Sequence, residues 1–140
     1  LFPSVPPEVE PARGRSELIL VADDEEALRH YYKRLLEQSG YRVLLAASAE
    51  EVLQMARDYR ERVAAVILDL GMPGMGGLGA LETMQAERLR IPTVIATGYA
   101  APETALASQE AGAKAVLRKP FDRESLLRAL QGALQSSGGG

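Results

Sequence analysis

Val63-Ala-Ala-Val-Ile-Leu-Asp69-Leu-Gly-Met-Pro73 is the stretch that decides the fold. The apolar run before Asp69 has no polar break, which is typical of a strand buried on both faces in a parallel sheet covered by helices. Asp69 follows this run directly, and Gly71 and Pro73 favour a turn immediately after it. Because open α/β sheets bind ligands at the carboxyl ends of their strands, Asp69 is the first candidate site residue.

Length and composition fit one globular domain. The chain has 140 residues, of which 46% are hydrophobic and 25% are charged, and this is enough for a single core. A formal net charge of −3 argues against nucleic acid or an anionic membrane as a partner. The absence of cysteine excludes disulfides and thiolate sites and is compatible with a reducing cytosol, so we expect a cytoplasmic location. No apolar run approaches the roughly 18 residues of a membrane span.

Both ends of the sequence are expected to lie outside a domain at residues 17–135. Residues 1–16 contain four of the eight prolines together with several charged residues, a composition that favours an extended linker. An ordered extension packed on the domain is the alternative. Residues 136–140, which are Ser-Ser-Gly-Gly-Gly, are expected to form a flexible tail. The linker and the first residue, Leu1, favour a piece of a longer chain, tethered after an upstream domain.

Strands and helices are predicted to alternate through the domain. Strands are expected at 18–22, 42–46, 63–69, 91–97 and 115–117, with a helix after each. Ser48-Ala-Glu-Glu51 matches a capping box at the start of the second helix, and Asp122 is expected to cap the last one. Strict alternation requires parallel pairing through right-handed crossovers. The predicted fold is α/β: a flavodoxin-like, doubly wound five-stranded parallel sheet of order 2-1-3-4-5, with helices on both faces.

Helical periodicity predicts how the first and fourth helices pack. In the first helix, Leu28, Tyr31 and Leu35 are expected to define the buried face. His30, the only histidine, then lies on the solvent side, where it is not a phosphodonor. The fourth helix is expected to run from about residue 102 to 112, and its one large apolar residue is Leu106. It is therefore expected to be the least anchored element, which suits a switch.

In the predicted strand order, five polar residues come to one edge of the sheet. Asp23 and Asp24 follow the first strand, Asp69 ends the third, Thr97 ends the fourth, and Lys119 follows the fifth. Three carboxylates repel one another unless a cation neutralises them, and oxygen ligands without His or Cys favour Mg²⁺ over Zn²⁺. Asp69 is placed to be the nucleophile that forms an acyl phosphate. Lys119 and Thr97 are placed to bind phosphoryl oxygens.

Each of these residues alone has a simpler explanation. Asp23-Asp24-Glu25 could be an N-cap with acidic residues in the first helical turn. Lys119 could be a solvated loop charge, and Thr97 an ordinary β-branched strand residue. Their shared location, at the carboxyl ends of strands that the topology brings together, favours a phosphoryl-transfer site.

These motifs resemble those of response-regulator receiver domains of two-component signalling. The resemblance covers about residues 17–135, with the motifs in the same order and spacing. The matching motifs are Asp23-Asp24, Asp69-Leu-Gly-Met-Pro-Gly-Met75, Thr97-Gly98 and Lys119-Pro120-Phe121.

The resemblance implies a role for each site residue. Asp69 would accept a phosphoryl group from the phosphohistidine of a histidine kinase or a histidine phosphotransfer domain. Asp24, Asp69 and the backbone carbonyl of Gly71 would hold Mg²⁺, and Asp23 would support the ion, usually through water. The residues implied to contact the phosphoryl group are Thr97 and Lys119.

The chain departs from the family at one position. Receivers usually carry a Tyr or Phe three residues before the Lys, where this chain has Val116, so rotation of an aromatic ring cannot transmit the signal here. Tyr99 is a candidate to cover the site instead. The resemblance also implies a cis bond between Lys119 and Pro120, because X-Pro bonds are those in which the cis form is accessible.

Other functions stay open at this point. A dehalogenase-like phosphatase also uses an Asp nucleophile with Mg²⁺, but its motif is Asp-x-Asp on the first strand, and Asp69-Leu-Gly71 lacks the second Asp. A flavodoxin-type flavin site is disfavoured because an acidic cluster would repel the flavin phosphate. Among signalling proteins we expect a receiver module that is not itself an enzyme, within a hybrid sensor histidine kinase. A stand-alone or DNA-binding response regulator is the alternative.

Overall fold

The structure is a computed structural model, and it describes residues 16–72, 74–98 and 102–138. Residues 1–15 of the linker expected at 1–16 lie outside these ranges, as do Pro73 and Tyr99, so the expectations for them stay predictions. None of the helices in the described ranges is long and apolar enough to cross a membrane.

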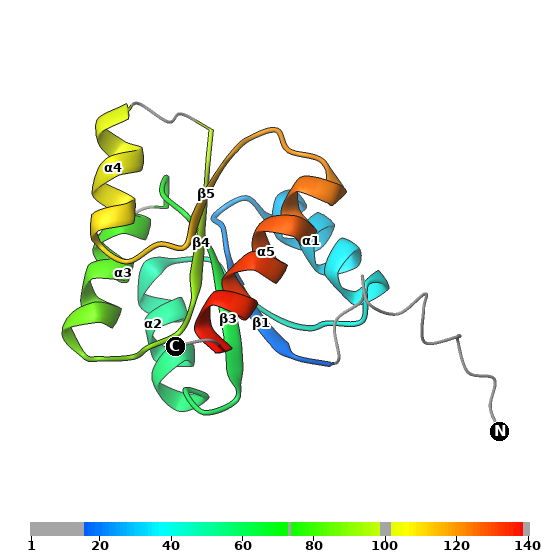
Figure 1. The fold of residues 1–140 in the computed structure, drawn as a ribbon, viewed down its shortest axis with the longest axis horizontal. Coiled ribbons are helices and arrows are strands. Elements are labelled where there is room, and N and C mark those ends of the chain that lie inside the picture. The colour runs from blue at the N-terminus through cyan, green and yellow to red at the C-terminus, as the bar shows by residue number, and fades with distance from the viewer. Residues whose placement is uncertain (1–15, 73, 99–101, 139–140) are drawn as a thin grey trace, which may run out of the picture.

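The described chain alternates strands and helices, as predicted. The strands are β1 (Leu18–Ala22), β2 (Arg42–Ala46), β3 (Val63–Asp69), β4 (Thr93–Thr97) and β5 (Ala115–Arg118). The helices are α1 (Glu26–Gln38), α2 (Ala49–Asp58), α3 (Gly76–Ala86), α4 (Pro102–Glu110) and α5 (Arg123–Gly138). The strands form one parallel sheet in the order β2-β1-β3-β4-β5. Helices α1 and α5 cover one face of this sheet, and α2, α3 and α4 cover the other (Figure 1). The predicted flavodoxin-like fold is confirmed.

Two hydrophobic clusters, one on each face, hold the sheet between its helices. Successive residues of a strand point to opposite faces, so Ile19 and Ile67 pack with α1 and α5, whereas Leu20 and Leu68 pack with α2 and α3. By the same alternation, the side chains of Asp23, Asp69 and Lys119 lie on the face that α1 and α5 cover, just beyond the last core residues of their strands. The strand pattern therefore brings these three side chains to the same side of the sheet edge.

Two helices begin with the predicted side-chain caps. The Ser48 hydroxyl accepts a hydrogen bond from the Glu51 N–H at 3.1 Å. The Glu51 carboxylate accepts one from the Ala47 N–H at 2.8 Å, one residue before the N-cap Ser48, so one donor of the α2 terminus and one of the preceding loop are satisfied. At the start of α5, the Asp122 carboxylate accepts from the Ser125 N–H at 2.8 Å.

Helix α1 differs in part from the prediction. Tyr31 was predicted on the buried face, but it is 42% exposed, while the neighbouring Tyr32 is 3% exposed. Consecutive residues lie about 100° apart around a helix, and Tyr32 occupies the centre of the buried stripe, so Tyr31 is left at its edge. Leu35 is buried, and His30 is exposed as predicted.

Several element boundaries also differ, among them those of β4 and α5. Strand β4 begins at Thr93 rather than at residue 91, because Pro92 has no N–H to give to the ladder and the Ile91 N–H donates to the Leu89 carbonyl instead. Helix α5 continues to Gly138, so residues 136–138 of the expected tail are helical. Extending an established helix by a few residues is far easier than nucleating one.

Candidate functional site

The three predicted carboxylates meet at the carboxyl edge of the sheet. Ala22 pairs with Leu68 in register, so Asp23 and Asp69, the next residues of the two strands, are neighbours. Asp23, Asp24 and Asp69 each place one carboxylate oxygen within 4.8 Å of the others. Asp23 is fully buried and Asp69 is 6% exposed, whereas Asp24 is exposed. The cluster thus has two buried members and one that faces solvent.

Lys119 supplies the positive charge of the site. Its Nζ lies 2.8 Å from Oδ2 of Asp23 and 3.4 Å from Oδ1 of Asp69, and its side chain is 17% exposed. The Lys119 N–H donates to the Thr97 carbonyl at 2.7 Å, which fixes the start of the loop after β5. The simpler explanation of Lys119 as a solvated loop charge is therefore wrong, because its ammonium group bridges two buried carboxylates.

The ionisation of Asp69 and Lys119 reflects burial and mutual contact. Burial raises the pKa of Asp69 above its usual value, and the charge of Asp23 adds to this rise. A hydrogen bond from the Gly71 N–H, at 3.2 Å, and the nearby Lys119 ammonium lower it only in part. Burial alone would lower the pKa of Lys119, but the hydrogen bond to Asp23 and the charge of Asp69 outweigh it, so the pKa is raised. A protonated Lys119 is therefore stabilised among the carboxylates.

The remaining predicted residues lie around this cluster. Thr97 ends β4 and is 5% exposed. Gly71 follows the end of β3 by two residues and is exposed beside the Asp69 carboxylate. The peptide bond between Lys119 and Pro120 is cis, as predicted. Val116 is partly buried on the opposite face of the sheet, against the hydrophobic cluster that packs with α2 and α3.

Two contacts of the β1–α1 loop, residues 23–25, were not predicted from the sequence. The Glu25 N–H donates to Oδ1 of Asp23 at 2.9 Å, and Nη1 of Arg29 donates to the Asp23 carbonyl at 2.7 Å. Glu25 is the N-cap residue of α1, and its side chain makes no capping bond. The predicted alternative of a simple acidic N-cap therefore does not describe this loop. A cation four residues into the helix that follows an acidic loop was the only sequence signal for Arg29.

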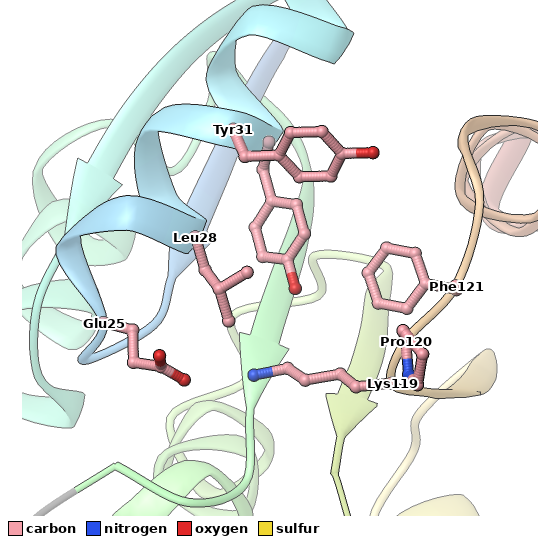
Figure 2. Close-up of a pocket in the computed structure, with 7 residues that line it drawn as sticks. Glu25, Leu28, Tyr31, Lys119, Pro120 and Phe121 are labelled. Carbon is pink, nitrogen blue, oxygen red and sulfur yellow. The ribbon is translucent and has the colours of Figure 1, made fainter.

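An aromatic cleft of about 440 Å³ adjoins the acidic cluster. Figure 2 shows Leu28 and Tyr31 of α1 on one side, Pro120 and Phe121 on the other, and Lys119 reaching between them toward the first turn of α1. Tyr32, which also lines the cleft, stacks on Phe121 with ring centroids 5.5 Å apart. Burial, and then the charges of Asp23 and Asp69, raise the pKa of Tyr32 well above its usual value, so its hydroxyl stays neutral.

The donor set fits a magnesium ion. Among the described residues, Asp23, Asp24 and Asp69 are the one group of three acidic, His or Cys side chains close enough to share an ion. All of their donors are oxygens, which a small, hard cation prefers. Asp24 faces solvent, so an ion held here would keep room for water ligands.

Comparisons with known proteins agree with this geometry. Residues 19–131 match the response regulator receiver domain family. Sensory/regulatory protein RpfC of Xanthomonas campestris pv. campestris is 45% identical over 123 residues, which are 85% of this chain and 17% of RpfC. CAI-1 autoinducer sensor kinase/phosphatase CqsS of Vibrio cholerae is 36% identical over 78% of this chain and 16% of CqsS. The chain thus spans about one sixth of the length of these two relatives.

A solved structure agrees as well. A response regulator receiver domain protein from Clostridium thermocellum superposes with a TM-score of 0.82 and 30% identity, covering 86% of this chain and 96% of that one. The strand order, the acidic edge and the family match lead to the same conclusion: this chain belongs to the response regulator receiver domain family of two-component signalling.

Proposed function

We propose that this domain is a phosphorylation-dependent signalling switch in which Asp69 accepts a phosphoryl group from a phosphohistidine with the help of Mg²⁺. The observation that carries the proposal is the position of Asp69, which lies beside two further carboxylates and 3.4 Å from the Lys119 ammonium. A carboxylate in this setting can act as a nucleophile toward phosphorus. The receiver is a phosphoryl acceptor in this scheme and does not turn over a free substrate.

The transfer forms one bond and breaks one. An oxygen of Asp69 attacks phosphorus as the bond from phosphorus to the donor imidazole nitrogen breaks, and the electron pair of that bond returns to the imidazole. Asp23, Asp24, Asp69 and the Gly71 carbonyl would hold Mg²⁺, which neutralises charge on the phosphoryl oxygens when it is bound. Lys119 turns from the Asp69 carboxylate to a phosphoryl oxygen, and the Thr97 hydroxyl donates to another.

The proposed partner is a histidine kinase or a histidine phosphotransfer domain. A donor histidine must come into contact with Asp69, so its carrier must cover part of the surface around the acidic edge. The aromatic cleft offers apolar area there, with Leu28 and Tyr31 on α1 and Phe121 across from them. The net charge of −3 does not favour a nucleic-acid contact through this domain.

Helix α4 is the proposed route by which phosphorylation is communicated. Its large apolar residue, Leu106, is 56% exposed, while Ser108 is fully buried and its hydroxyl has no hydrogen-bond partner in the described structure. Both features weaken the attachment of α4, and weakly attached elements are the ones that move. Since Val116 cannot act as a rotating ring, we expect the change to pass through the loop after Thr97 to α4.

The proposed parent is a hybrid sensor histidine kinase, and the receiver module is proposed to lie in the cytoplasm. The support is the 45% identity to the sensory/regulatory protein RpfC and the match to the sensor kinase/phosphatase CqsS, each several times longer than this chain. A kinase in the same chain would present its phosphohistidine at a high effective concentration. A stand-alone or DNA-binding response regulator is the alternative, and the full reading frame decides between them.

Phosphotransfer from a phosphohistidine tests the proposal. A histidine kinase or phosphotransfer domain carrying radiolabelled phosphohistidine is mixed with the domain, with and without EDTA. We expect label on the wild type with Mg²⁺, and no label on Asp69→Asn or in EDTA. Steady release of phosphate from a phosphate ester, without labelling of Asp69, would instead favour the phosphatase alternative and contradict the proposal.

A further inference from the structure

The β1–α1 loop carries two of the three carboxylates, but only one of them is held by its own contacts. The Asp23 carboxylate is fixed at both oxygens, by the Glu25 N–H at 2.9 Å and by Lys119 Nζ at 2.8 Å. Asp24 is the exposed member of the cluster. Its direction is therefore set by the backbone on which it sits.

Arg29 contacts that backbone directly. From the first turn of α1, its Nη1 reaches back six residues to the carbonyl oxygen of Asp23 at 2.7 Å. This carbonyl belongs to the rigid peptide unit that joins Asp23 to Asp24, so a bond to it fixes the plane from which the Asp24 side chain leaves. A charged donor makes this a stronger bond than an ordinary backbone contact.

We infer that Arg29 is a positioning residue of the acidic site, which holds Asp24 in the direction needed to bind a divalent cation. The inference rests on the proposed function, because it assigns the positioning residue for the same ion. It adds a residue that lies outside the carboxylate cluster and has no direct role in the transfer. Outer residues of this kind commonly change metal affinity by about tenfold or more when they are removed.

The direction in which Arg29→Met changes Mg²⁺ affinity separates a positioning role from a simple effect of charge. Arg29 is a cation next to a site that binds a cation, so its charge alone weakens Mg²⁺ binding. If only charge mattered, Arg29→Met would bind Mg²⁺ more tightly than wild type. If Arg29 positions Asp24, Arg29→Met weakens Mg²⁺ despite the removal of a repulsive charge. Met keeps most of the apolar stem of the side chain, so packing of α1 changes little.

The experiment measures Mg²⁺ binding by titration calorimetry on wild type, Arg29→Met and Arg34→Met. Arg34 is a matched control, since it is an exposed arginine of the same helix and has no hydrogen bond or ion pair with the β1–α1 loop in the described structure. We expect the dissociation constant of Arg29→Met to rise about tenfold, and that of Arg34→Met to stay equal or fall slightly. Amide hydrogen exchange of the metal-free protein supplies a second readout, in which Glu25 loses protection in Arg29→Met alone.

The possible outcomes are distinct. Weaker Mg²⁺ binding with faster Glu25 exchange, and with the protection of the rest of α1 unchanged in the metal-free protein, supports the inference. Equal or tighter Mg²⁺ binding by Arg29→Met, in a wild type that binds the ion, overturns the inference and leaves the proposed function standing. A wild type that binds no Mg²⁺ overturns both. A general loss of stability with protection lost throughout α1 would assign Arg29 a structural role and overturn the inference.

Discussion

Gly77→Ala tests whether Asp69 is held by close backbone packing beneath it. Gly77 is the second residue of α3 and is buried. A Cβ added there lies 2.8 Å from both the Asp69 carbonyl carbon and the Leu70 Cα, and closer still to the Asp69 carbonyl oxygen. Carbon atoms in ordinary contact lie about 3.5–4.0 Å apart. The start of α3 and the end of β3 would therefore have to separate by about 1 Å.

The expected loss of stability follows from two opposing effects. Ala in place of Gly within a helix contributes about 1 kcal/mol of stabilisation. Overpacking costs about 1–3 kcal/mol, and the upper end applies here because the obstructing atoms are backbone and cannot rotate away. We expect Gly77→Ala to lower the free energy of unfolding by about 1–2 kcal/mol. A shift of Asp69 of about 1 Å should also slow its phosphorylation at least about tenfold.

Urea denaturation, with Gly132→Ala as the control, measures this effect. Gly132 lies in α5, and a Cβ added there meets no atom within 4 Å. Gly132→Ala should therefore keep the helical gain of up to about 1 kcal/mol. If Gly77→Ala is as stable as Gly132→Ala, or phosphorylates at the wild-type rate, the packing argument for Asp69 is wrong.

Three further predictions concern caps, burial and charge. Ser48→Ala should lower the free energy of unfolding by about 1 kcal/mol in urea denaturation, because it removes the cap of α2. Ser108→Ala should stabilise the domain, since it removes a buried hydroxyl without a partner, and should reduce the change in hydrogen exchange that phosphorylation causes in α4; unchanged exchange would contradict the proposed route. Burial raises the folded-state pKa of Asp69, which means that the folded state favours the protonated carboxyl group. The stability that Asp69 contributes is therefore present below its unfolded-state pKa and is lost as the pH rises through its folded-state pKa. Asp69→Asn should therefore unfold at a higher temperature than wild type at neutral pH in metal-free buffer, with the difference vanishing in acid.

Much of the fold was predictable because local and global signals agree. The apolar runs of β1 and β3 favoured strands buried on both faces, and alternation with helices favoured parallel pairing. The strand order then placed Asp23, Asp69 and Lys119 at one edge, as found. Side-chain caps were also readable, because their donors lie three residues away in the sequence.

The remainder depends on three-dimensional contacts that sequence spacing does not encode. Periodicity could not decide which of the neighbouring Tyr31 and Tyr32 lies at the centre of the buried stripe, since this is set by Phe121 from the other end of the chain. The contact of Arg29 with a backbone carbonyl leaves only a weak signal in residue types, namely a cation in the first helical turn after an acidic loop. The crowding at Gly77 likewise arises between α3 and the backbone of β3, and the frequent glycines between residues 71 and 79 do not reveal it by themselves.

Intact-mass analysis after treatment with a small acyl phosphate tests the central claim most directly. Wild type and Asp69→Asn are incubated with the donor and Mg²⁺, with EDTA added to a parallel wild-type sample, and peptide mapping locates the modified residue. We predict one phosphoryl group per wild-type molecule, located on Asp69, and none in the variant or in EDTA. Equal incorporation in Asp69→Asn, or undiminished incorporation in EDTA, would contradict the assignment of Asp69 as a magnesium-dependent phosphoryl acceptor.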